Sequence, residues 1–275
     1  MGDVRAAATL DESLLPDEGD VAFYREHGWW ISPVILPPEV LDGAERGMER
    51  YYAGELDTPD KTWNAPPAEG LRKNDYASLH VRELARLVSQ PLIAASAARL
   101  AGTDTIRLWH DQLLYKPVDA AGAPANVGWH TDRQYWQSCT SEQMLTAWIG
   151  FHDVDEAGGS VSFIDGSHRW EVSGLDFFSQ DLPGLQARLA AQGHSPQIRP
   201  TRMRRGQVSF HHCRTVHGSG PNHGAGPRRS LAVHLQPGDN RHRPGTAGHG
   251  NDRLVRTRDG VPDYTDPDLC RQLWP

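Results

Sequence analysis

The 275 residues of this chain suffice for one large β domain, and 28 Lys and Arg against 35 Asp and Glu give a formal net charge of −7. The sequence has no run of basic residues that could follow a phosphate backbone, so we expect no nucleic-acid partner. It also has no signal-peptide pattern and no apolar run of membrane-spanning length, so we expect no membrane partner and a cytoplasmic location.

The first part of the chain is predicted to be mainly helical. Residues 1–15 carry few side chains that could pack, and we expect them to be disordered. Residues 16–275 are expected to form a single domain, which begins with a helical layer that extends to about residue 102. In this layer helical spacing, Pro and Gly signals predict helices over 16–27, 37–52, 79–88 and 91–100, a strand over 29–36 and an irregular loop over 54–77.

From residue 103 the pattern changes to short strands separated by Gly and Pro turns. Strands are predicted over 105–116, around His130, and over 144–154, 160–164, 207–211 and 230–236, with a helical insertion over 175–191. The fold class is therefore mainly β with flanking helices. Its core, over about 103–237, is a double-stranded β-helix, that is, a cupin-like jelly roll. Residues 238–275 form a lid or a tail, and the sequence does not decide between the two.

A candidate metal site lies in the stretch from Trp129 to Trp136. If this stretch is extended, His130 and Asp132 leave the same face of the strand. A third ligand is available in His217, at the end of a short apolar strand. Two His and one carboxylate on one face of a metal leave three positions open, which is the facial triad of non-haem Fe(II) oxygenases.

A His-x-Asp pair is a weak signal alone, but Arg228 follows His217 by eleven residues. A 2-oxo acid such as 2-oxoglutarate chelates iron at one end, and its far carboxylate must be held at a fixed distance. A guanidinium can grip that carboxylate with two parallel hydrogen bonds. Arg228 is therefore the predicted anchor of the cosubstrate.

These motifs resemble the phytanoyl-CoA dioxygenase-like branch of the Fe(II)/2-oxoglutarate oxygenases. The resemblance covers about half the chain and departs from the family pattern in two minor places: Thr131 replaces a Gln, and Ala157-Gly158 replaces Asn-Gly. It rests on Tyr115-Lys116-Pro117, on 129–136, on Asp155-Glu156-Ala157-Gly158-Gly159, on Gly166-Ser167-His168, on His217-Gly218-Ser219 and on Pro227-Arg228.

The resemblance implies that His130, Asp132 and His217 are the catalytic iron ligands. It implies further that Arg228 and Ser219 bind the far carboxylate of 2-oxoglutarate, that Trp136 packs beside the cosubstrate and that Lys116 contacts it. His168 is expected to be structural, and His211 and His212 lack an Arg at the matching distance.

Strand alternation extends the predicted pocket beyond the residues that the resemblance assigns. Gln112 and His110 share a strand face with Lys116, and Thr146 shares one with Trp148. We therefore expect Gln112 and Thr146 on the cosubstrate side, and His110, Trp148 and Trp63 on the substrate side. Ordinary hydrogen bonds on a strand face are the alternative role for the polar members.

The predicted enzyme is a dioxygenase that uses Fe(II), 2-oxoglutarate and O2 to abstract a substrate hydrogen. Hydroxylation, epimerisation, desaturation and oxidative cyclisation share the same ligands, so the sequence does not choose among them. Asp132 argues against halogenation, because related halogenases replace this carboxylate with a small residue.

The expected substrate is a bulky small molecule, such as a secondary metabolite in a tailoring pathway. The loop over 54–77 and four tryptophans motivate this expectation, although the tryptophans fit an ordinary core equally well: Trp29, Trp63, Trp109 and Trp136. Two alternatives stay open, a zinc hydrolase that uses the same three ligands and a non-catalytic jelly-roll binding protein. The oligomeric state is also open.

Overall fold

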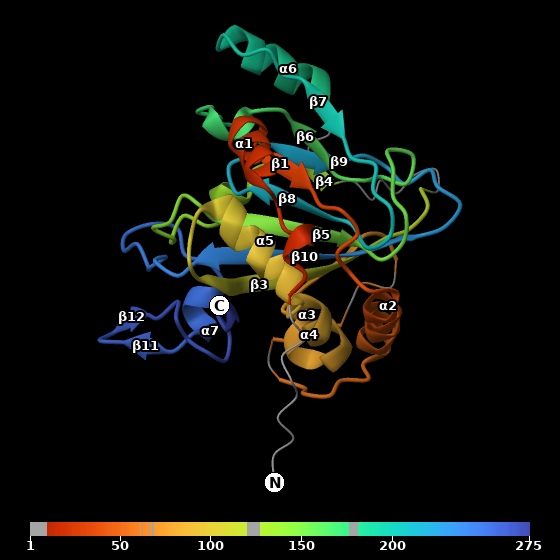
Figure 1. The fold of residues 1–275 in the computed structure, drawn as a ribbon, viewed down its shortest axis with the longest axis vertical. Coiled ribbons are helices and arrows are strands. Elements are labelled where there is room, and N and C mark those ends of the chain that lie inside the picture. The colour runs from red at the N-terminus through yellow and green to blue at the C-terminus, as the bar shows by residue number, and fades with distance from the viewer. Residues whose placement is uncertain (1–9, 61, 66, 68, 120–126, 176–180) are drawn as a thin grey trace.

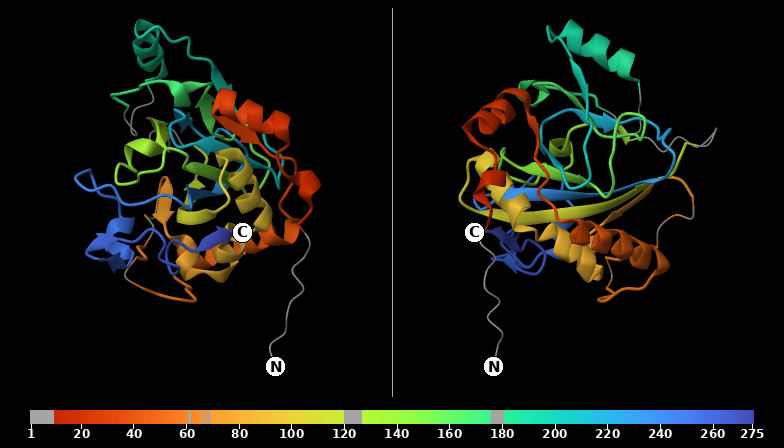
Figure 2. Two further views of the ribbon diagram at one scale, coloured as in Figure 1. Left: turned by 60° about the vertical axis from the view of Figure 1, so that its left-hand side comes forward. Right: turned by 45° about the vertical axis from the view of Figure 1, so that its right-hand side comes forward.

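Two antiparallel sheets form the centre of the molecule, and helices cover the outer face of the larger one (Figures 1 and 2). The computed structural model describes residues 10–60, 62–65, 67, 69–119, 127–175 and 181–275. Side chains of both sheets meet in one buried cluster, to which Leu114 and Trp148 contribute from the larger sheet and Phe163 from the smaller. This arrangement confirms the predicted jelly roll with flanking helices.

The larger sheet has seven strands. Their order is β1-β8-β5-β10-β3-β13, and β2 also pairs with β3. The strands are β1 (Trp29–Ile31), β2 (Arg72–Asp75), β3 (Ile106–Lys116), β5 (Leu145–Gly150), β8 (Val208–His212), β10 (Arg228–Pro237) and β13 (Gln272–Trp274). The long strands β3 and β10 pair from Lys116 with Arg228 to Ile106 with Pro237, so they define the register of the sheet.

The smaller sheet has four strands in the order β4-β9-β6-β7. They are β4 (Val127–His130), β9 (His217–Ser219), β6 (Ser162–Ile164) and β7 (Ile198–Pro200). A separate hairpin consists of β11 (Thr257–Arg258) and β12 (Val261–Pro262).

Helix α5 lies across the larger sheet, whereas α2, α3 and α4 lie at one end of the molecule and α6 at the opposite end (Figure 1). The helices are α1 (Glu18–His27), α2 (Pro38–Ala53), α3 (Ala77–His80), α4 (Arg82–Val88), α5 (Pro91–Ala101), α6 (Leu182–Ala191) and α7 (Asn251–Leu254). Short 3-10 helices are η1 (Glu12–Leu14), η2 (Asp132–Gln134) and η3 (Ser167–Arg169). In the described part of the chain, none of the helices is long and apolar enough to cross a bilayer.

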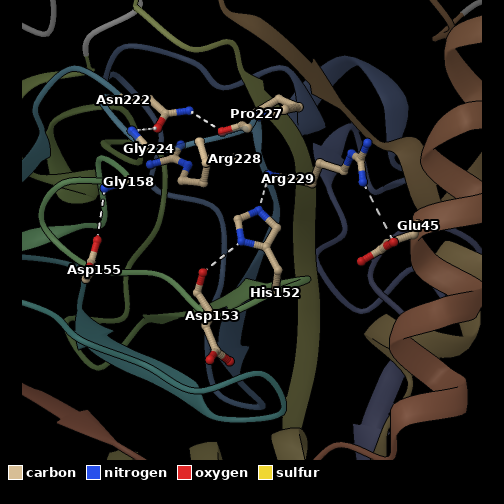
Figure 3. Close-up of a pocket in the computed structure, with 12 residues that line it drawn as sticks. Glu45, His152, Asp153, Asp155, Gly158, Asn222, Gly224, Pro227, Arg228 and Arg229 are labelled. Carbon is tan, nitrogen blue, oxygen red and sulfur yellow. Dashed lines mark hydrogen bonds and ion pairs between the residues drawn. The ribbon is translucent and has the colours of Figure 1, made fainter.

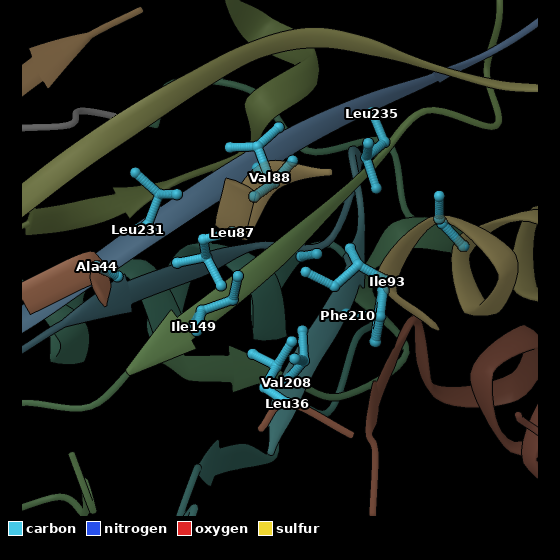
Figure 4. Close-up of a cluster of buried hydrophobic side chains, with 14 of the residues drawn as sticks. Leu36, Ala44, Leu87, Val88, Ile93, Ile149, Val208, Phe210, Leu231 and Leu235 are labelled. Atoms are coloured by element: carbon cyan, nitrogen blue, oxygen red, sulfur yellow. The ribbon is translucent and has the colours of Figure 1, made fainter. Parts of the chain in front are cut away.

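Strand alternation gives the larger sheet an apolar outer face and a mixed inner face. On β10, Leu231, Val233 and Leu235 are fully buried and pack in the same cluster as side chains of α2, α4 and α5 (Figure 4). The intervening residues of β10 therefore point inward, toward the smaller sheet. The helical layer thus leaves the inner face free to carry functional groups.

Two predicted elements in the helical layer differ from the structure. The strand expected over 29–36 ends at Ile31, because Pro33 has no N–H to donate to a neighbouring strand. The helix expected over 79–88 is divided into α3 and α4, since Val81 has an extended backbone. The break accompanies the full burial of His80, whose Nδ1 lies 2.8 Å from the carbonyl oxygen of Thr58.

The segments expected to be irregular are partly structured. Of the N-terminal 15 residues, 1–9 lie outside the described part of the chain, whereas Glu12–Leu14 form a 3-10 turn capped by Asp11 and Leu15 is buried. The loop expected over 54–77 contributes β2 to the larger sheet.

The helical insertion expected over 175–191 is shorter in the structure. Its helix α6 begins at Leu182, and residues 176–180 lie outside the described part of the chain.

The C-terminal segment 238–275 packs against strand β3 of the larger sheet. The side chain of Asn251 donates a hydrogen bond of 2.6 Å to the carbonyl oxygen of Trp109. Tyr264 is 1% exposed and packs edge-on against the same indole, with ring centroids 4.7 Å apart. The segment is therefore docked on β3 rather than extended away from the domain.

Candidate metal centre

Three side chains converge on one buried point between the sheets. His130 ends β4, His217 begins β9, and the two residues are cross-strand partners. The Nε2 atoms of His130 and His217 lie 3.9 and 3.7 Å from Oδ1 of Asp132. Ligand atoms of all three lie within 4.8 Å of one another, so one metal ion could bind them together.

Asp132 reaches this point from a turn rather than from a continuing strand. Strand β4 ends at His130, and Asp132 is the first residue of η2. Thr131 between them is extended, with φ −116° and ψ 145°, so the two flanking side chains still leave the same side of the backbone. The expected convergence therefore holds, although the expected strand does not.

The histidines are oriented for metal binding. Nδ1 of His130 lies 2.8 Å from the Gly128 carbonyl oxygen, and Nδ1 of His217 lies 2.9 Å from that of Thr215. A carbonyl oxygen can only accept, so the proton sits on Nδ1 and the Nε2 lone pair faces the site. Burial lowers the pKa of both imidazoles, which keeps them neutral.

Asp132 supplies the negative charge of the centre. Burial on its own raises the pKa of this carboxyl group, but the polar groups around it, His211 among them, hold the pKa well below its ordinary value. A carboxylate and two neutral imidazoles on one side of a metal suit iron(II) and leave positions free for other ligands. The donor set therefore fits the predicted metal.

Arg228 is a buried cation close to this centre. The guanidinium lies over the ring of Trp148, 5.3 Å from its centroid, and Nη1 donates to the carbonyl oxygen of Gly159. Its Nε has no hydrogen-bond partner among the described residues. Burial lowers its pKa to about 10, so the group stays charged near pH 7. A buried guanidinium with a spare N–H fits a carboxylate, as binding of 2-oxoglutarate requires.

Lys116 lies opposite Arg228 on β3 and holds Ser219 in place. Its Nζ lies 2.6 Å from Oγ of Ser219 and 2.6 Å from the carbonyl oxygen of Gly220. Burial, and then the charge of Arg228, lower the pKa of Lys116 to about 6. The two basic residues are thus cross-strand partners, but only Arg228 lines the pocket of the triad, and Lys116 lies behind Ser219.

Arg228 and Arg229 point in opposite directions. Figure 3 shows Arg229 extending toward Glu45 of helix α2, whereas Arg228 turns away from that helix. The Arg229–Glu45 ion pair measures 3.7 Å and is partly exposed. Alternation on β10 therefore selects Arg228, and not Arg229, for the interior.

The triad and Arg228 share one pocket. Eight of the predicted site residues line it: Gln112, His130, Asp132, Thr146, Trp148, His217, Ser219 and Arg228. Its remaining walls combine apolar and polar groups: Leu114, Val127, Val161, His211, Gly218, Ala232 and His234. The Gln112 amide is already engaged, donating a hydrogen bond of 2.8 Å to Asp75.

Other predicted residues lie outside the lining of this pocket. Trp136 packs behind His234, with ring centroids 5.1 Å apart. His110 packs against His234 as well, with ring centroids 4.3 Å apart. Trp63 lines a separate depression beside Tyr52 and Arg72. It belongs to the loop that follows α2, and this loop packs on the helical side of the molecule. Its expected contact with the substrate therefore has no support in the geometry.

The other two tryptophans that motivated a bulky substrate are also structural. Trp109 is fully buried, and Trp29 stacks on Phe163 and donates from Nε1 to Asp165. These positions correspond to the ordinary-core alternative. The tryptophan at the pocket is Trp148, beneath Arg228.

Two histidines that were not predicted as site residues lie beside the triad: His211, which was considered only as a substitute for His217, and His234. Nε2 of His211 lies 3.3 Å from Oδ2 of Asp132, and Nδ1 of His234 lies 2.7 Å from Oγ1 of Thr146. Both line the pocket. The signal was available for His234, because steps of two residues along β10 from Arg228 reach Ser230, Ala232 and His234 on the same face.

Residues 24–230 match the family model described as "Phytanoyl-CoA dioxygenase (PhyH)". The chain belongs to the phytanoyl-CoA dioxygenase family. It is 28% identical over 175 residues to a probable alpha-ketoglutarate-dependent hypophosphite dioxygenase of Stutzerimonas stutzeri. The aligned region covers 62% of this chain and 58% of that protein. The peroxisomal phytanoyl-CoA dioxygenase of Rattus norvegicus is 22% identical over 248 residues, or 84% of this chain and 71% of the relative.

Solved structures of non-haem enzymes share the fold along most of its length. The alpha ketoglutarate dependent carbocyclase SnoK from nogalamycin biosynthesis has a TM-score of 0.69 and 26% identity, covering 90% of this chain and 92% of SnoK. The epimerase SnoN, in complex with Fe3+, alpha ketoglutarate and nogalamycin RO, has a TM-score of 0.69 and 25% identity, covering 93% and 98%. The comparisons confirm the predicted class of iron- and 2-oxoglutarate-dependent dioxygenases and do not support a zinc hydrolase or a non-catalytic binding protein.

Proposed function

We propose that this protein oxidises a bulky small molecule in secondary-metabolite tailoring, in the cytoplasm, as an Fe(II)/2-oxoglutarate-dependent oxygenase. One observation carries the proposal: the His130, Asp132 and His217 side chains open into the same pocket as the buried guanidinium of Arg228. An iron chelator anchored at its far end by Arg228 would lie between the two groups. This arrangement matches a cosubstrate with a 2-oxo acid at one end and a carboxylate at the other.

The residues of the chain divide the work in that reaction. His130, Asp132 and His217 would hold iron on one face, and Arg228 with Ser219 would fix the far carboxylate of 2-oxoglutarate. Iron, 2-oxoglutarate and O2 together supply the oxidising power that removes hydrogen from an unactivated C–H bond. Apolar walls keep water from the chelate and set the direction of approach: Leu114, Trp148, Val161 and Ala232.

The substrate class rests on the solved structures of similar enzymes. SnoK is described as a carbocyclase and SnoN as an epimerase, both from nogalamycin biosynthesis, and SnoN binds nogalamycin RO. These two outcomes support hydrogen abstraction followed by ring closure or inversion, beside hydroxylation. We therefore expect a bulky secondary metabolite as the substrate.

The test is succinate formation with Fe(II), ascorbate and 2-oxoglutarate in the presence of different candidate substrates. We expect nogalamycin RO or a similar secondary metabolite to raise succinate formation well above the rate without substrate, and an Asp132→Ala variant to lack the response. Stimulation by hypophosphite or phytanoyl-CoA alone would refute the substrate class. Absence of iron-dependent succinate formation under every condition, with zinc retained tightly, would refute the reaction class.

A further inference from the structure

A row of polar side chains crosses the inner face of the larger sheet directly beside Asp132. His234 on β10 pairs with Thr146 on β5, and Thr146 pairs with His211 on β8. Cross-strand partners project their side chains to the same face, about 5 Å apart. All three residues are buried; Thr146 and His234 are hydrogen-bonded, whereas neither ring nitrogen of His211 has a hydrogen-bond partner among the described residues.

The row is joined to Asp132 by a hydrogen-bond chain with a defined direction. Oγ1 of Thr146 lies 2.6 Å from Oδ2 of Asp132 and 2.7 Å from Nδ1 of His234. A carboxylate can only accept, so Thr146 donates its single proton to Asp132. The oxygen of Thr146 then accepts from His234, whose proton is thereby placed on Nδ1.

A second side chain contacts the same carboxylate oxygen without a well-aligned hydrogen bond. Nε2 of His211 lies 3.3 Å from Oδ2 of Asp132. The other oxygen, Oδ1, faces the two ligand histidines at 3.9 and 3.7 Å. The carboxylate is thus divided: Oδ1 faces the metal site, and Oδ2 is held from behind by two neighbouring strands.

We propose that Thr146 and His211 are positioning residues that make Asp132 bind iron through Oδ1 alone, and that His234 orients the Thr146 hydroxyl. The inference rests on the function proposed above. A carboxylate that bound through both oxygens would take one of the three positions that the triad leaves open. Two are needed for 2-oxoglutarate and one for O2, so the reaction depends on a single-oxygen contact.

The decisive variants remove one polar contact each. Thr146→Val removes the hydroxyl at nearly constant volume, Thr146→Ser keeps the hydroxyl, and His211→Phe removes the imidazole that contacts Oδ2 of Asp132. Ser209→Ala is the matched control, because Ser209 is buried on the same face of β8 and its hydroxyl has no partner among the described residues. Melting temperatures establish that each variant folds.

The measurement is anaerobic Fe(II) affinity by calorimetry, followed by the visible charge-transfer band on addition of 2-oxoglutarate. We expect Thr146→Val to weaken iron binding about 10- to 100-fold and to lower the band per bound iron, as loss of outer hydrogen bonds to metal ligands does elsewhere. His211→Phe should have a smaller effect, because the 3.3 Å contact of His211 is not a well-aligned hydrogen bond. Thr146→Ser and Ser209→Ala should bind iron within about threefold of the wild type, well inside the range lost by Thr146→Val.

Asp132→Ala separates failure of this inference from failure of the proposed function. If Asp132→Ala loses iron while Thr146→Val and His211→Phe retain wild-type affinity and a full band, the triad stands and the positioning role is wrong. If Asp132→Ala itself binds iron as tightly as the wild type, Asp132 is not a ligand and the proposed metal centre is wrong.

Discussion

Replacement of Arg228 by Leu tests the cosubstrate anchor. The wild-type guanidinium is 2% exposed, donates one N–H to Gly159 and keeps Nε free for a ligand. Each charge-assisted hydrogen bond to a carboxylate contributes about 1.5–3 kcal/mol. Losing two of them costs at least about 3 kcal/mol, which corresponds to a dissociation constant for 2-oxoglutarate at least about 100-fold higher.

The assay is an anaerobic titration of the Fe(II)-loaded protein with 2-oxoglutarate, supported by the 2-oxoglutarate dependence of succinate formation. Arg229→Leu is the matched control, since Arg229 is the adjacent residue but forms a partly exposed ion pair with Glu45. Arg228→Lys should recover only part of the affinity, because an ammonium lacks the planar fork of a guanidinium. An unchanged requirement in Arg228→Leu, or an equal loss in Arg229→Leu, would refute the assignment.

Two further predictions concern the surroundings of Arg228. The pKa of Lys116 is lowered to about 6 from 10.5, so above pH 6 the unfolded chain binds more protons than the folded one, and stability should rise with pH. The melting temperature of the metal-free protein should therefore increase between about pH 7 and 8.5. Lys116→Met should reduce this rise of the melting temperature with pH, and an equal rise in the variant would contradict the lowered pKa of Lys116. Gly159 has φ +68°, and an added Cβ would lie 2.9 Å from the Pro221 carbonyl oxygen, whereas at Gly158 the nearest atom would be 3.6 Å away. Gly159→Ala should lose about 1–3 kcal/mol of stability and bind 2-oxoglutarate more weakly by displacing the carbonyl group that holds Arg228, while Gly158→Ala should do neither; equal melting temperatures for the two variants would contradict this.

The convergence of His130, Asp132 and His217 and the inward direction of Arg228 could be predicted from the sequence because they depend on residue type and local spacing. His130 and Asp132 flank one extended residue, and that local geometry persists although the strand ends between them. Arg228 and Lys116 lie on long strands, where alternation alone determines which side chains face inward. In these cases a local rule determines the direction of the side chain.

The positions that could not be predicted depend on contacts between distant segments. Strand β2 has the sequence Arg-Lys-Asn-Asp, which has little intrinsic preference for a strand, and its pairing with β3 defines it. Trp63 lies in the loop after α2 and packs against the core cluster between the helices and the larger sheet. The C-terminal segment covers Trp109, to whose carbonyl oxygen Asn251 donates a hydrogen bond. An aromatic residue near a motif in the sequence therefore gives no direction in space without the partner that buries it.

An anaerobic titration of the metal-free protein, first with Fe(II) and then with 2-oxoglutarate, tests whether His130, Asp132 and His217 hold iron within reach of a 2-oxo acid anchored by Arg228. We expect ultraviolet and visible absorption to show a weak visible charge-transfer band that requires both additions and is absent from Asp132→Ala. If the wild-type protein gives no band and retains zinc tightly, these residues do not form an iron centre for a 2-oxo acid.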